Sequence, residues 1–163
     1  MQPKDLEASN GVESPVSARW VRNHWWSNHH FLKCAGRTIA TVHANGSIGM
    51  AWVGDIKYVL ERLRLPPYVT IRDAQSDDLV VRFCLMPAKG GLLAEFNDGE
   101  SFRFGWTHFW KAEWAWTDDT GATVLLFKRS RFMKVVFPRR YRDKWPLLAI
   151  LELAMAELAR PWF

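Results

Sequence analysis

Cysteine is scarce in this sequence of 163 residues, because only Cys34 and Cys84 occur, far apart and without a Cys-x-x-Cys spacing. A disulfide framework is therefore excluded, and a reduced intracellular compartment is the default expectation. Both cysteines lie among apolar residues, which favours inert, buried thiols over reactive ones.

Long hydrophobic runs are missing as well. The first 16 residues contain no apolar core of signal-peptide length, and we expect residues 1–16 to form a flexible N-terminal tail. The longest apolar segment, Pro146–Leu158, is shorter than the roughly 20 residues that span a bilayer, and it carries two carboxylates. We therefore expect no transmembrane span, a cytoplasmic protein with at most peripheral membrane contact, and one domain over residues 17–163.

Motifs that would fix a reaction are also missing, since no Gly-x-Ser-x-Gly, P-loop or Rossmann fingerprint occurs. His29 and His30 are adjacent, so on a strand they point to opposite faces, and no third ligand follows at a recognised metal spacing. Asp118 and Asp119 belong to an Asp-Asp-Thr-Gly sequence, which suits a turn better than a catalytic carboxylate pair. The sequence thus predicts a protein that is not an enzyme and holds no metal or other cofactor.

The sequence does contain short apolar segments that alternate with turn signals about every ten residues, as in β-sandwiches and barrels. Asn45-Gly46 and Asp98-Gly99 indicate tight hairpin turns. Residues 55–63 fit either a strand or a short helix capped by Asp55, and their neighbours favour a strand. The segments that read as strands are 17–23, 30–34, 38–43, 47–53, 56–63, 67–73, 79–86, 92–96, 101–106, 112–117, 122–128 and 131–138.

The last apolar segment, about 146–159, consists mainly of strong helix formers, with apolar side chains around nearly the whole circumference. Such a pattern indicates a buried helix. Closing the strands into a barrel removes exposed edges, but a barrel of about twelve strands is too wide for its own side chains to fill. We therefore predict a mainly β protein, a closed antiparallel barrel of about twelve strands around a buried hydrophobic C-terminal helix.

The two carboxylates of this helix need an explanation in a filled barrel. Glu152 and Glu157 are about 140° apart on a helical wheel, so one solvent-facing stripe does not hold both. A buried carboxylate either becomes neutral or finds a partner. We predict that Glu157 reaches solvent and that Glu152 is paired or hydrogen-bonded.

Positive charge is concentrated between residues 128 and 144, in a segment that we call the basic strip. Such a strip attracts phosphate groups of lipid or nucleic acid. The same charges also fit ordinary solvated faces and turns, which is the commoner origin of a charge run. The strip consists of Lys128, Arg129, Arg131, Lys134, Arg139, Arg140, Arg142 and Lys144, and only Asp143 opposes it.

Tryptophan is abundant, with ten residues in the chain. Those that alternate with polar residues between Phe102 and Trp116 are expected to line the core. Trp25, Trp26 and Trp110 fall in expected loops, where two interpretations stay open: burial in the core, or insertion of an exposed ring at a lipid interface.

The closing half resembles a known family. The run FRFGWTHFWKAEWAWTDDTGATVLLFKRSRFMKVVF, followed by a basic linker and PLLAILELAMAEL, is similar to LURP-one-related and phospholipid-scramblase proteins, which share the tubby-type C-terminal fold. That resemblance implies twelve strands around a hydrophobic C-terminal helix and a non-enzymatic protein associated with membranes or lipids. Scramblases carry an acidic calcium-binding segment before the last helix, whereas this chain has RRYRDK there, and it lacks their cysteine-rich acylation run.

From these observations we expect a non-enzymatic tubby- or LURP-one-like module that binds anionic phospholipid or a protein partner through the basic strip. The alternatives are a single-stranded nucleic-acid-binding β-barrel, in which basic and aromatic side chains bind phosphates and bases, and a small-ligand-binding barrel.

Overall fold

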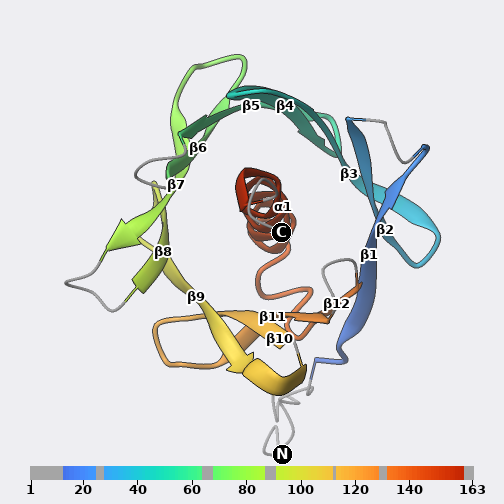
Figure 1. Cartoon of the computed structure of the whole chain (residues 1–163), viewed down its shortest axis with the longest axis vertical. Coiled ribbons are helices and arrows are strands. Elements are labelled where there is room, and N and C mark those ends of the chain that lie inside the picture. Colours follow the sequence, from blue (N-terminus) through green and yellow to red (C-terminus); the bar gives the residue numbers. More distant parts are fainter. Residues whose placement is uncertain are drawn as a thin grey trace, which may run out of the picture.

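The computed structural model describes residues 13–24, 28–63, 68–86, 91–111, 113–128 and 132–159. The described residues form twelve strands in one closed antiparallel barrel, in which each strand pairs with the next in sequence and β12 pairs with β1 (Figure 1). The strands are β1 (Val16–Arg22), β2 (His29–Cys34), β3 (Arg37–Asn45), β4 (Ile48–Val53), β5 (Ile56–Leu63), β6 (Tyr68–Asp73), β7 (Leu79–Met86), β8 (Gly91–Phe96), β9 (Ser101–His108), β10 (Glu113–Thr117), β11 (Thr123–Lys128) and β12 (Phe132–Val135). A short 3-10 helix, η2 (Phe109–Lys111), follows β9, and α1 (Trp145–Ala159) ends the described chain.

The predicted fold class is confirmed, including the strand at residues 56–63. In β5 the buried side chains are Tyr58, Leu60 and Arg62, so burial follows the period of two that belongs to a strand. The expected strand at 131–138 is shorter, because β12 ends at Val135. Pro138 has no N–H to donate to a ladder, and the chain turns there toward the helix.

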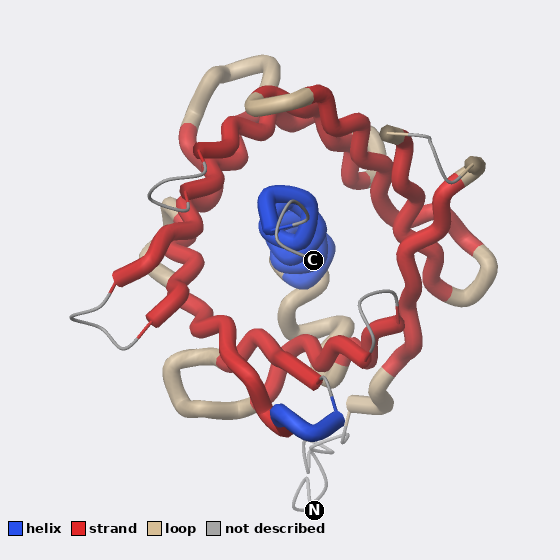
Figure 2. Tube along the Cα trace, in the orientation of Figure 1, coloured by secondary structure: helices blue, strands red, loops and turns tan. Residues whose placement is uncertain are grey.

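Helix α1 lies inside the barrel, along its axis (Figures 1 and 2). It contacts β3, β4, β6 and β11, and its residues Leu147–Leu151 are buried. Small residues on the inner wall, such as Ala40 and Ala51, leave room for it. At Gly49 a Cβ atom would stand 3.1 Å from the carbonyl oxygen of His43, so this position of β4 accepts only glycine without a shift of backbone. No helix within the described ranges is both long and apolar enough to cross a membrane.

The barrel has two distinguishable ends. The even-numbered strands stop where the chain passes from β12 into α1, and we call this the entry end. The odd-numbered strands stop at the other end, toward which α1 runs, and we call this the exit end.

Candidate functional site on the outer wall of the barrel

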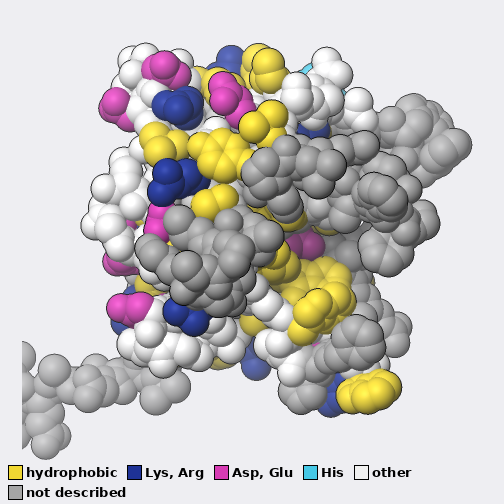
Figure 3. Space-filling view, turned by 60° about the vertical axis from the view of Figure 1, so that its left-hand side comes forward, with side chains coloured by type: hydrophobic (Ala, Val, Ile, Leu, Met, Phe, Trp, Pro, Cys, Tyr) yellow, Lys and Arg dark blue, Asp and Glu magenta, His cyan; other side chains and the backbone are white. Residues whose placement is uncertain are grey.

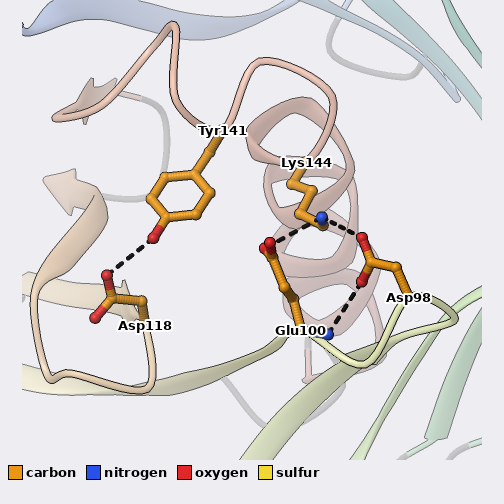
Figure 4. A network of polar contacts seen from close by, with 5 residues as sticks. All are labelled: Asp98, Glu100, Asp118, Tyr141 and Lys144. Atoms are coloured by element: carbon orange, nitrogen blue, oxygen red, sulfur yellow. Dashed lines mark hydrogen bonds and ion pairs between the residues drawn. The ribbon is translucent and has the colours of Figure 1, made fainter.

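The structure divides the basic strip among different environments, and Arg129 and Arg131 lie outside the described residues. Lys144 is at the entry end, where its ammonium group binds the carboxylates of Asp98 and Glu100 (Figure 4). Burial alone would lower the pKa of Lys144, but these two hydrogen bonds raise it overall. Lys144 therefore fixes the linker before α1 to the β8–β9 turn.

The neighbouring residues of the entry end also contact acidic or aromatic groups, through the backbone or the side chain. The backbone N–H groups of Arg139 and Arg140 donate to the carboxylate of Glu13. The guanidinium of Arg140 lies 5.0 Å from the ring centre of Tyr141. Arg142 stands 3.7 Å from the Asp143 carboxylate, and both side chains are highly exposed.

A second contact fixes the same linker. Tyr141 donates a hydrogen bond of 2.9 Å to the buried carboxylate of Asp118, which also accepts from Thr120 and from the backbone N–H of Ala122 (Figure 4). Burial would raise the pKa of Asp118, but these hydrogen bonds lower it overall, whereas burial and the bond to Asp118 raise the pKa of Tyr141 to about 12. The predicted turn at Asp118-Asp119 is thus confirmed.

Replacing Tyr141 with phenylalanine should destabilise the protein by about 1–3 kcal/mol at pH 7, because a buried carboxylate loses a donor. Asp118 has a lowered folded-state pKa, so its contribution is present above the ordinary value of 3.8 and is lost as the pH falls below it. The difference between the variant and the wild type should therefore shrink in acid. Urea unfolding over a pH series measures it, with Tyr68→Phe, a half-buried residue of β6, as the control. Equal effects of both substitutions would contradict a specific role for Tyr141.

The rest of the strip belongs to a row of outward-facing side chains that crosses four strands. Strand pairing places Lys128 opposite Phe132, Phe132 opposite Arg19, and Arg19 opposite Lys33. Lys134 lies two residues beyond Phe132 on β12 and therefore on the same face, opposite Ser17. We call Arg19, Lys33, Lys128 and Lys134, with Phe132 among them, the cationic face.

This face is hollowed. An open depression of about 470 Å³ is lined by residues of β1, β2 and β12 and the turn after β2, and both Arg19 and Lys33 contribute to it. Phe132 also lines it, with 57% of its surface exposed. The depression thus brings cationic groups together with an exposed aromatic ring.

Charge on this face is poorly compensated. Lys128 is 3.9 Å from Glu113, but within the described part of the chain no ion pair joins Arg19, Lys33 or Lys134 to a carboxylate. Like charges directly opposite each other on neighbouring strands are destabilising, and Arg19 and Lys33 have that arrangement. An anion bound between them would remove this cost.

The other sequence-predicted candidates lie elsewhere. As expected for adjacent strand residues, His29 is exposed and His30 is buried, and the His29 ring stacks on that of His43 with 4.1 Å between centroids. Among the described residues no group of three or more His, Cys, Asp or Glu side chains is arranged to hold a metal ion. Both cysteines are free and half-buried rather than buried, and burial raises the pKa of Cys34. Trp25, Trp26 and the side chain of His108 lie outside the described part.

Glu152 differs from its prediction. It is only 3% exposed, and its Oε2 has no hydrogen-bond partner among the described residues. Burial raises the pKa of Glu152 to about 8, and the indole N–H of Trp114, which makes no well-formed hydrogen bond itself, offsets this only in part. The carboxyl group is therefore kept mostly protonated at neutral pH rather than paired. The side chain of Glu157 lies outside the described part, so its expected exposure stays a prediction.

Comparisons with known proteins address the fold and not the site. No protein-family model and no curated protein matches the sequence. The fold is similar to the X-ray structure of a protein from Arabidopsis thaliana, with a TM-score of 0.60 and 15% identity over 86% of this chain and 91% of that chain. At this identity the likeness shows a shared barrel-and-helix fold alone.

Sequence reasoning missed Arg19 and Lys33 as members of the site. Side chains alternate between the two faces along 17–23, so Arg19 and the buried Trp20 lie on opposite faces. This alternation could have predicted that Arg19 points outward. The pairing of the first strand with the last, which brings Arg19 beside Phe132 and Lys134, is a long-range contact that no local pattern encodes.

Proposed function

We propose that the protein is a non-enzymatic module of the tubby-like type that binds anionic phospholipid headgroups through the cationic face. The observation that carries this proposal is the row Lys128, Phe132, Arg19 and Lys33, in which adjacent cations have no carboxylate between them. Such a module would act in the cytoplasm, as a peripheral membrane protein.

The chemistry of the face suits a phosphate group that is attached to an apolar chain. A guanidinium group binds phosphate through two parallel hydrogen bonds, and a lysine ammonium adds a compact positive charge. Arg19 and Lys33 supply one of each, side by side. Phe132 supplies apolar contact next to them, which a free phosphate would not use but the glycerol and upper acyl region of a lipid would.

The alternative ligands fit less well. A small molecule inside the barrel would compete with α1, which occupies the axis. A single-stranded nucleic acid requires several aromatic platforms along a basic groove, whereas the depression on this wall offers one, Phe132. A protein partner with an acidic surface stays open as an outcome of the experiment.

Vesicle co-sedimentation tests the proposal. Wild-type protein should bind vesicles of phosphatidylcholine with phosphatidylserine, bind phosphatidylcholine alone much less, and lose binding as salt screens the charges. In the double variant Arg19→Gln/Lys134→Gln, affinity for the anionic vesicles should fall roughly 30-fold, since each cation near such a surface contributes about 1 kcal/mol.

The matched control is Arg139→Gln/Arg142→Gln, which removes the same charge from the basic strip but from the entry end. We expect little loss of affinity in this variant. Equal loss in both double variants would show that only net charge matters and would contradict the cationic face as the site. Equal binding of the wild type to neutral vesicles, or no binding to either kind, would reject the lipid proposal, and a salt-sensitive shift with oligonucleotides instead would favour nucleic acid.

A further inference from the structure

The two ends of the barrel differ sharply in charge. At the exit end, the described residues of the connections between strands, 23–24, 28, 46–47 and 109–111, include no Asp or Glu. The connections at the entry end contain eight carboxylates and four cations. The carboxylates are Asp55, Asp77, Asp78, Asp98, Glu100, Asp118, Asp119 and Asp143, and the cations are Arg139, Arg140, Arg142 and Lys144. Figure 3, in which the left-hand side of Figure 1 is turned forward, shows Asp and Glu side chains mainly on its left-hand side, with Lys and Arg side chains among them.

Large aromatic side chains are exposed at the exit end. Trp110, in η2, is 93% exposed, and Trp106, near the end of β9, is 61% exposed. The next residue after Trp110 is the exposed Lys111. We call Trp106, Trp110 and Lys111 the aromatic rim.

Trp106 of the rim packs against other aromatic rings. Trp106 meets Trp114 edge to face with 5.2 Å between centroids, and Trp114 in turn stacks on the buried Phe127 at 6.4 Å. These ring contacts fix Trp106 in its exposed position on the folded barrel. Keeping such rings in water is unfavourable, because large apolar side chains gain free energy when they leave it.

We propose that the aromatic rim inserts into the interface of a lipid bilayer, so that the barrel docks at an angle, with the rim at its exit end inserted and the adjoining cationic face turned toward the headgroups. This inference rests on the proposed function and adds to it a docking orientation and a second set of contacts. The rim adjoins the part of the cationic face that lies at the exit end, since β10 alone separates β9 from β11, where Lys128 is the last residue. From Lys128 and Phe132 the cationic face runs along the wall to Lys33, beside the β2–β3 turn of the entry end.

The chemistry of the rim favours a bilayer as its occupant. Tryptophan concentrates at membrane interfaces because its ring is apolar and its N–H remains hydrogen-bonded among headgroups. Lys111 next to Trp110 reaches headgroup phosphates at the same depth. The acidic entry end is repelled by an anionic surface, so the charge division orients the barrel before any ring inserts.

Two variants of Trp110 test this inference. In Trp110→Ser, affinity for vesicles of phosphatidylcholine with phosphatidylserine should fall about tenfold, because the ring no longer leaves water on binding. The control is Ile56→Ser, which removes an exposed apolar side chain (51% exposed) beside the β4–β5 turn of the entry end and should bind like the wild type. In Trp110→Phe, much of the affinity should remain, but part of the fluorescence quenching that lipids with brominated acyl chains cause in the wild type should disappear.

The outcomes separate this inference from the proposed function. If the wild type does not bind anionic vesicles, both fail. A second outcome is that the wild type binds and Arg19→Gln/Lys134→Gln weakens binding, whereas Trp110→Ser does not. If brominated lipids then also quench Trp110→Phe as strongly as the wild type, the lipid-binding function stands and insertion is overturned. If Trp110→Ser weakens binding to an oligonucleotide but not to vesicles, the rim is a base-stacking surface and insertion is likewise overturned.

Discussion

Replacing Glu152 with glutamine should make the protein more stable by about 5 kcal/mol at pH 8 and above, because a folded-state pKa of about 8 compares with an ordinary value of 4.5. Below pH 4.5 the carboxyl group is protonated in both the folded and the unfolded chain, so the substitution should have little effect there. Between these values the folded protein keeps a proton that the unfolded chain releases. Wild-type stability therefore falls as the pH rises through this window, and the variant should not share that fall.

Urea unfolding of both proteins across pH 4–9 measures this difference directly. Other carboxylates, such as Asp118, titrate in acid in both proteins, so the subtraction isolates Glu152. Glu61→Gln, at an exposed position of β5, is the control and should give parallel profiles. If Glu152→Gln lowers stability at pH 8, the carboxylate must be ionised and specifically partnered in the folded protein, and the conclusion that burial keeps Glu152 protonated is wrong.

The fold could be predicted because local and global signals agree. Period-two burial, turn residues such as Asn45-Gly46 and an all-round apolar C-terminal segment each indicate an element by themselves. Together these signals are compatible with few topologies. About twelve strands close most simply when each pairs with its neighbour in sequence, and the one predicted helix must then fill the interior. The barrel and its buried helix followed from these observations.

The site could be predicted only in part, because its members come from opposite ends of the chain. The run of charge between 128 and 144 was correctly located in sequence, but it is not one surface. Lys144 is bound to Asp98 and Glu100, which the sequence places over 40 residues away, whereas Lys134 faces outward beside β1. A run of charged residues shows only which charges are close in sequence. Ion pairing depends on which groups are close in the folded structure.

The same limit applies to Glu152. The sequence required an account of a carboxylate in an apolar helix and offered a partner or neutralisation as the two solutions. Which of them holds depends on what the inner wall presents. The group that faces Glu152 is the indole of Trp114, not a cation. The carboxyl group of Glu152 is therefore neutralised by keeping its proton.

Replacing Leu148 with aspartate should prevent the barrel from forming a stable native state at pH 7. Leu148 is fully buried on α1, two residues into the run that lines the barrel axis. Removing a buried leucine costs about 2–5 kcal/mol, and burying an unpaired carboxylate adds several more. The sum reaches the whole stability of a typical domain, roughly 5–15 kcal/mol, and in this protein Glu152 already reduces that margin above pH 4.5.

Near-UV circular dichroism and the cooperativity of thermal unfolding measure this effect, and Leu148→Met is the matched control, with an expected loss below about 1.5 kcal/mol. Partial recovery of the aspartate variant in mild acid should accompany protonation of its carboxyl group. A Leu148→Asp protein that unfolds as cooperatively as the wild type at pH 7 would mean that α1 does not fill the barrel. That result would be unexpected, because α1 contacts β3 and β4, whose buried Ala40 and Ala51 leave space that the helix side chains fill.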